Sequence, residues 1–84
     1  MIKFLCMVYD SKAEMYEPPF AANTEVEAER MFGDAVNDGQ SRVAKHPEDY
    51  QLFVIGTFDT STGELSPLSA RKLLGAGVKY TTSE

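Results

Sequence analysis

Two strongly apolar segments constrain the fold of this 84-residue chain more than any other feature. Residues 2–9 and 50–58 are rich in β-branched and aromatic side chains, a composition that favours strands. In both segments apolar side chains fall on both faces of the expected strand, which is typical of strands that are central or covered on both sides. We expect residues 2–9 to form the centre of a sheet.

The second apolar segment is expected to alternate along its length. Strict alternation assigns its large side chains to two faces, with Leu52, Val54 and Phe58 on one and Phe53 and Ile55 on the other. Gly56 interrupts the run, which indicates a bulge or a close approach of another backbone.

An amphipathic helix is predicted to begin after Thr24. The Thr24 hydroxyl and the Glu27 carboxylate have the capping-box spacing, which satisfies two amides at a helix start. Apolar residues then recur at helical spacing, and the other positions form an acidic outer face. Gly39 is the expected C-terminal stop. Gly33, inside the helix, costs about 1 kcal/mol relative to alanine, and a close contact would explain its presence.

Shorter elements are expected around this framework. Residues 10–23 contain a double proline and predict an exposed loop, followed by a brief edge strand at 20–22. Residues 40–49 read as a polar connection. Residues 59–63 predict a hairpin turn, and residues 64–67 a short returning edge strand.

The C-terminal region carries the weakest pattern. Residues 69–79 combine apolar side chains with two glycines, which suits a helical turn or a docked arm. A flexible tail is expected from about residue 75 to residue 84. The predicted fold class is α+β: a single domain, residues 1–84, with a small antiparallel sheet of two long and two short strands and one amphipathic helix packed on it.

Composition limits the possible classes of protein. The length allows only one core. No segment reaches the roughly 18 apolar residues of a membrane helix, and none has the form of a signal peptide, so a soluble, unexported protein with no membrane partner is expected. Cys6 is the only cysteine, which excludes an internal disulfide and a multi-cysteine zinc site and fits a reducing compartment.

No catalytic or metal-binding constellation is apparent. Cys6 and His46 form the only possible thiol–imidazole pair, and no third group orients them, so Cys6 is interpreted as a core residue. Residues 59–64 resemble the opening of a calcium loop, but Ala70 stands where the bidentate ligand belongs. We therefore predict that the protein is not an enzyme and has no cofactor and no metal.

The charge of −5 is unevenly distributed. Residues 1–41 hold three basic and eight acidic side chains, whereas residues 42–84 hold five of each. If the chain binds nucleic acid, the candidate surface lies in the second half, with basic side chains for phosphates and a tyrosine for base stacking. Its members are Arg42, Lys45, His46, Tyr50, Arg71, Lys72 and Lys79, with Tyr80 as an alternative stacking ring. In the rival hypothesis, Glu25 and Glu29 on the helix, or a sheet edge, bind a protein partner.

Several motifs resemble a known family. They are residues 45–50 (KHPEDY), 52–59 (LFVIGTFD) and 62–63 (TG), with weaker similarity at 9–13, 19–20, 29–32 and 34–37. On these the chain resembles the small nonstructural protein of gokushovirus-type microviruses, the phage ORF-five family, over nearly its whole length to about Leu74.

The resemblance implies a phage with a small circular single-stranded DNA genome and a product that acts in the host bacterial cytoplasm. It further implies a DNA-binding accessory role in viral DNA synthesis or packaging, with single-stranded DNA or phage replication and packaging proteins as partners. It transfers no defined DNA-contacting residues. Because the core is small, a homo-oligomer is expected.

Overall fold

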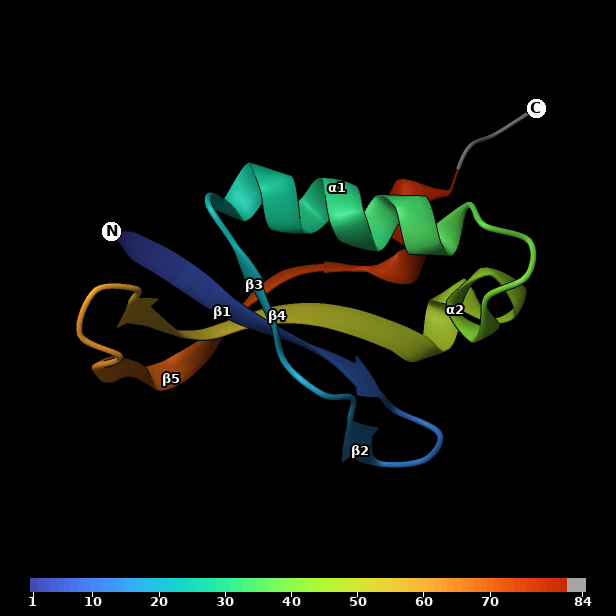
Figure 1. Ribbon diagram of the computed structural model, residues 1–84. Coiled ribbons are helices and arrows are strands. Elements are labelled where there is room, and N and C mark those ends of the chain that lie inside the picture. The colour runs from blue at the N-terminus through green and yellow to red at the C-terminus, as the bar shows by residue number, and fades with distance from the viewer. Residues whose placement is uncertain (82–84) are drawn as a thin grey trace.

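A five-stranded antiparallel sheet carries one long helix in the computed structural model, which describes residues 1–81 (Figure 1). The strands are β1 Ile2–Asp10, β2 Met15–Tyr16, β3 Phe20–Ala22, β4 Tyr50–Asp59 and β5 Leu65–Ala76. The helices are α1 Glu25–Val36, the short α2 Arg42–Lys45, and the 3₁₀ turns η1 Pro47–Asp49 and η2 Gly77–Tyr80. The predicted α+β class is confirmed, although three strands are long instead of two.

β1 lies inside the sheet, as its apolar character on both faces predicted. The strand order is β2-β1-β4-β5, and β3 also pairs with β1. Thus β2 and β3 share one edge of β1, and β4 covers the whole of the other edge. None of the helices in the described residues is long and apolar enough to span a membrane.

α1 begins as predicted and ends earlier than predicted. The Thr24 Oγ1 accepts a hydrogen bond from the backbone N–H of Glu27 at 3.0 Å, and the Glu27 carboxylate accepts one from the backbone N–H of Asn23 at 2.7 Å. The helix stops at Val36 and not at Gly39. Asn37 replaces the glycine as the cap, because its side-chain amide donates to the Gly33 carbonyl oxygen at 2.8 Å.

The core lies between α1 and the sheet. Cys6 and Leu52 are completely buried there, and Phe32 of α1 packs on them within the same cluster. Cys6 is therefore a core residue, as expected. Burial, with a smaller contribution from the charge of Glu25, raises the pKa of the Cys6 thiol from 9.0 to about 11. We call this helix-covered side of the sheet the closed face.

Gly56 marks both a bulge and a close backbone contact, as predicted. The register between β1 and β4 shifts between Leu5 and Cys6, so that β4 carries one extra residue. A Cβ at Gly56 would lie 2.8 Å from the Ser66 carbonyl oxygen in β5. Only glycine fits this crossing without a shift of the backbone.

The bulge overturns one sequence prediction. Strict alternation placed Phe58 on the same face as Leu52 and Val54, which both belong to the core. Phe58 instead pairs with Lys3, and Lys3 points away from the core because its neighbour Phe4 packs against it. One extra residue in β4 therefore moves Phe58 to the opposite side of the sheet.

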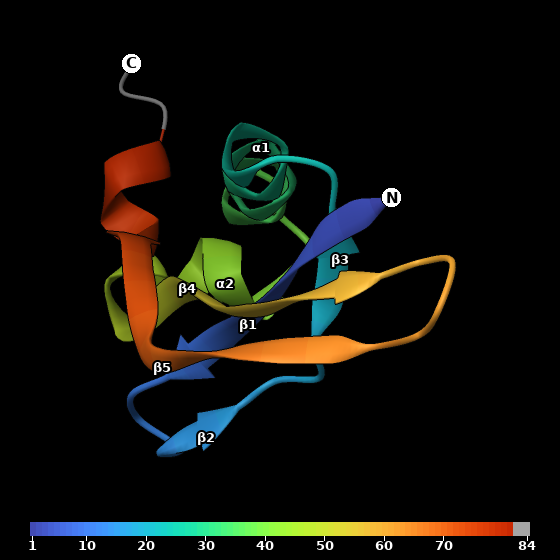
Figure 2. The ribbon, with the colours of Figure 1, turned by 90° about the vertical axis from the view of Figure 1, so that its left-hand side faces the viewer.

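β5 is longer than the sequence indicated. In place of a short strand at 64–67 and a helical turn or arm at 69–79, one strand runs from Leu65 to Ala76. Both ends pair with β4, and residues 68–71 have no partner in the register. The exposed edge of β4 supplies backbone partners to a segment with little strand alternation of its own. Figure 2 shows the bend in β5 between its two halves.

The chain after β5 is docked, in contrast to the flexible tail predicted from about residue 75. The structure places η2 against α1 and η1. A Cβ at Gly75 would lie 2.7 Å from the Tyr80 hydroxyl oxygen, and one at Gly77 would meet the Pro47 carbonyl oxygen, so both glycines permit this packing. The last three residues of the predicted tail lie outside the described residues.

Two connections contain elements that the sequence did not predict. In the expected polar connection at 40–49, the Ser41 hydroxyl accepts from the Ala44 backbone N–H at 3.0 Å and so caps α2. Pro47 then opens η1, a position that suits its fixed backbone. The other addition is β2, whose Tyr16 pairs with Tyr9 of β1.

Candidate functional site

The side of the sheet opposite α1 carries no helix in the part of the chain that the structure describes (Figures 1 and 2). We call this side the open face. Cross-strand partners share a face, so the register places large apolar side chains there from every long strand. They include Leu5, Met7, Tyr9, Phe53, Phe58, Leu65 and Leu73, with Tyr16 from β2.

Three rings on the open face contact one another across three strands. The ring centres of Tyr9 and Tyr16 lie 4.8 Å apart, and those of Tyr16 and Phe53 lie 6.1 Å apart with the edge of one toward the other. Arg71 of β5 completes the group, because its guanidinium carbon lies 5.0 Å from the Phe53 ring centre and 5.6 Å from that of Tyr16. These four residues form what we call the aromatic cluster, which spans the sheet from β2 to β5.

The open face differs from the closed face in charge. None of the positions that strand pairing places on it is acidic within the described residues, whereas Lys3 is basic. The acidic side chains of the strands, Asp10 and Asp59, pair with Tyr50 and Ile2 on the other side of the sheet. α1 adds its acidic face on that side too. An acidic protein therefore presents one surface from which carboxylates are largely absent.

The predicted nucleic-acid surface is not gathered in one place. Lys72 forms an ion pair with Glu25 of α1 at 3.0 Å, and Lys79 forms one with Glu29 at 3.5 Å. Both lysines thus face the helix, while their neighbour Arg71 lies on the open face. The same contacts bind the two glutamates of the rival hypothesis to groups within the chain.

The remaining predicted residues lie at the α2 end of the sheet. Lys45 and His46 are exposed at the end of α2, and Arg42 reaches the Glu17 carboxylate at 3.7 Å. Tyr50 is only 4% exposed, so its ring cannot stack on a base, and this part of the prediction is wrong. Alternation in the strand directs Tyr50 into the core.

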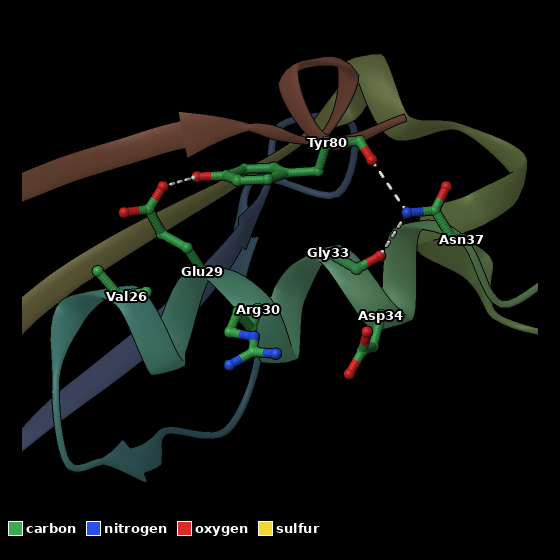
Figure 3. A pocket seen from close by; sticks show the side chains of 7 residues that line it. All are labelled: Val26, Glu29, Arg30, Gly33, Asp34, Asn37 and Tyr80. Atoms are coloured by element: carbon green, nitrogen blue, oxygen red, sulfur yellow. Dashed lines mark hydrogen bonds between the residues drawn. The ribbon is translucent and has the colours of Figure 1, made fainter. Parts of the chain in front are cut away.

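A depression of about 480 Å³ lies between α1 and η2 (Figure 3). The Tyr80 hydroxyl donates to the Glu29 carboxylate at 2.7 Å, and the Asn37 side-chain amide donates to the Tyr80 carbonyl oxygen at 3.0 Å. Burial, then the hydrogen bond to Glu29 and its charge, raises the pKa of Tyr80. The polar groups of the depression thus hold η2 on α1, and Tyr80 is half-buried against Phe32.

One group has the composition of a metal site. Ligand atoms of His46, Glu48 and Asp49 lie within 4.8 Å of one another, with His46 and Glu48 exposed. They are neighbours in sequence, and the Asp49 carbonyl oxygen accepts from the backbone N–H of Ser11 at 2.9 Å. The geometry is explained by the η1 turn itself, so we assign no metal to it.

The aromatic cluster was missed by sequence reasoning. Alternation placed Tyr9 and Phe53 on faces of their strands, but β2 was not predicted and Tyr16 therefore had no position. Arg71 was selected for its charge alone. The available signal was that both long strands are apolar on both faces while the chain predicts a single helix, which can cover only one of them.

Fold and open face together define a small α+β protein with one covered and one uncovered side of its sheet. The chain belongs to the phage ORF5 protein family, whose sequence model matches residues 3–80. It is similar to Protein ORF5 of Chlamydia phage 1, with 32% identity over 90 aligned residues that cover the whole of this chain and 94% of the relative. No solved structure matches the chain. The family resemblance inferred from the motifs is confirmed.

Proposed function

We propose that this phage protein is a non-enzymatic accessory factor that binds single-stranded DNA on its open face, during viral DNA synthesis or packaging in the host bacterial cytoplasm. The observation that carries the proposal is the aromatic cluster of Tyr9, Tyr16, Phe53 and Arg71 on the face without paired carboxylates. A sheet surface with stacked aromatics and nearby cations suits unpaired bases.

The chemistry favours a single strand over a duplex. Bases stack on aromatic rings only when they are unpaired, whereas duplex binding depends mainly on many phosphate contacts. A protein of charge −5 is poorly suited to the second mode. The open face offers Lys3 and Arg71 as local cations and places the acidic face of α1 on the other side of the sheet.

The same proposal accounts for modest affinity in one copy. Three rings provide room for only a few bases, so a homo-oligomer would gain affinity by placing several clusters on one strand of DNA. Phage replication or packaging proteins are the partners that such a complex would meet. The rival protein-interaction module is less favoured, because Glu25 and Glu29 already bind Lys72 and Lys79.

Titration of a fluorescent oligothymidylate at low and moderate salt tests the proposal. Replacing Tyr16 by alanine should weaken binding by about 5- to 100-fold, which is the value of one stacked base. The matched control is Met15→Ala, on the same two-residue strand, 63% exposed and on the opposite face of the sheet. It should leave the affinity unchanged.

A second pair of variants separates the open face from the α2 end. Lys3→Gln should weaken binding and reduce the dependence of log affinity on log salt by about 0.7, as expected for one lost phosphate contact to a single strand. Lys45→Gln should change neither quantity, because Lys45 lies at the end of α2. Absence of binding at low salt, or equal losses in Met15→Ala and Tyr16→Ala, would refute the proposal.

A further inference from the structure

Phe53 is unusually well covered for a residue on the open face. It is only 8% exposed although no described helix lies on that side of the sheet. Its cover includes Tyr16 and Arg71, whose side chains come from the two strands at the ends of the order β2-β1-β4-β5. Among the rings of the aromatic cluster, Phe53 is therefore the one that a base cannot reach in the free protein without displacing a side chain.

We propose that Arg71 is a removable cover: it occupies the stacking position on Phe53 in the free protein, and it moves to a phosphate when an unpaired base takes that position. This inference rests on the proposed function and specifies its ligand as a nucleobase with an adjoining phosphate. Arg71 is then a specificity-determining residue, because only a group that offers both a π-face and an anion replaces both of its roles.

The structure leaves Arg71 free to make this exchange. It forms no ion pair in the described part of the chain, and it lies in the 68–71 segment of β5 that has no partner in the register with β4. The adjacent Lys72 differs in both respects, because it pairs with Val54 and its ammonium holds the Glu25 carboxylate at 3.0 Å. The rings alone thus hold the guanidinium, whereas Lys72 anchors the strand beside it.

The exchange is chemically balanced. A guanidinium over an exposed ring shifts the equilibrium by only about two- to fivefold, whereas a base on a ring contributes more. The released guanidinium has five donors arranged in a planar fork that matches phosphate oxygens. Displacement therefore loses one weak contact and gains two others, and the phosphate contact is the one that salt weakens.

The predicted signature is a reversal of sign with salt. At low salt, Arg71→Ala should bind oligothymidylate more weakly than the wild type because it lacks the phosphate contact. Between about 20 mM and 1 M NaCl its relative affinity should rise about 15-fold, the value of one ionic contact to a single strand. At the highest salt it should bind about two- to fivefold more tightly than the wild type, because nothing has to be displaced from Phe53.

Lys3→Gln is the matched control, because Lys3 is a cation on the same face and is not placed over a ring. Its relative affinity should approach that of the wild type at high salt and not exceed it. A second measurement needs no DNA: the ring protons of Phe53 should shift in Arg71→Ala when the cation is removed. If the alanine variant is poorly folded by circular dichroism, Arg71→Gln provides the same comparison.

The outcomes distinguish the two proposals. If the wild type does not bind oligothymidylate at low salt, both fail. If the wild type binds and Tyr16→Ala does not, while Arg71→Ala is weaker than the wild type at every salt concentration, single-stranded DNA binding stands and the removable cover is refuted. Arg71 would then be a permanent part of the binding surface. A crossing of the two affinity curves with salt supports the cover.

Discussion

The two faces of the sheet have similar side chains and different fates. On the closed face Cys6 and Leu52 are fully buried beneath α1. On the open face Tyr9 and Tyr16 remain partly exposed, and the burial of Phe53 depends on side chains from neighbouring strands. The chain has helix enough for one face only. The difference shows that a helix covers a sheet permanently, whereas a layer of long side chains can be opened.

The largest expected difference concerns stability. Leu52→Ala should lower the free energy of unfolding by about 2–5 kcal/mol, because it leaves a cavity in the closed face. Leu73→Ala on the open face should cost less than about 1 kcal/mol, because Leu73 is already 52% exposed. Urea denaturation followed by circular dichroism measures both values. Equal losses would show that the open face is as firmly packed as the closed one.

The next effect tests the docking of η2, which completes the closed side. Gly77→Ala should destabilise the protein by about 1–3 kcal/mol, because the new Cβ meets the Pro47 carbonyl oxygen and one backbone must shift. Gly39→Ala is its control, since a Cβ there meets nothing within 4 Å. Thermal unfolding should separate the two variants. A neutral Gly77→Ala would contradict the close contact between η1 and η2.

A smaller effect is expected for Tyr80→Phe, which removes only the hydroxyl that donates to Glu29. The loss should be about 1 kcal/mol at neutral pH. Because the pKa of Tyr80 is raised in the folded protein, the contribution of this hydroxyl is complete below about pH 10 and is lost as pH rises beyond it. Wild-type stability should therefore fall more steeply above pH 10 than that of the variant. Parallel curves would exclude the hydrogen bond.

The Cys6 thiol provides the most local test. Its pKa is raised to about 11 from 9.0, so its contribution to stability is complete below pH 9 and is lost as pH rises through about 11. At pH 8 a thiol reagent should modify the native protein far more slowly than the urea-unfolded chain. Fast modification of the native protein would show that the closed face opens as readily as the open face.

Periodicity predicted most of the framework, and pairing between distant segments decided the rest. The helix start at Thr24, both apolar strands and the turn at Gly63 follow from local patterns. The length of β5 does not, because residues 65–73 are all exposed and the edge of β4 makes them a strand. The site was harder to predict, because Tyr9, Tyr16, Phe53 and Arg71 come from four strands whose register no single segment encodes.

The irregular middle of β5 has a consequence for solubility. β5 is the long outer strand of the sheet, and a regular outer strand is a template on which other chains can add and aggregate. Here Pro67 lacks a backbone N–H, and residues 68–71 break the register, so the edge does not offer one continuous row of donors and acceptors. The same irregularity that leaves Arg71 mobile thus ends the growth of the sheet at the boundary of one molecule.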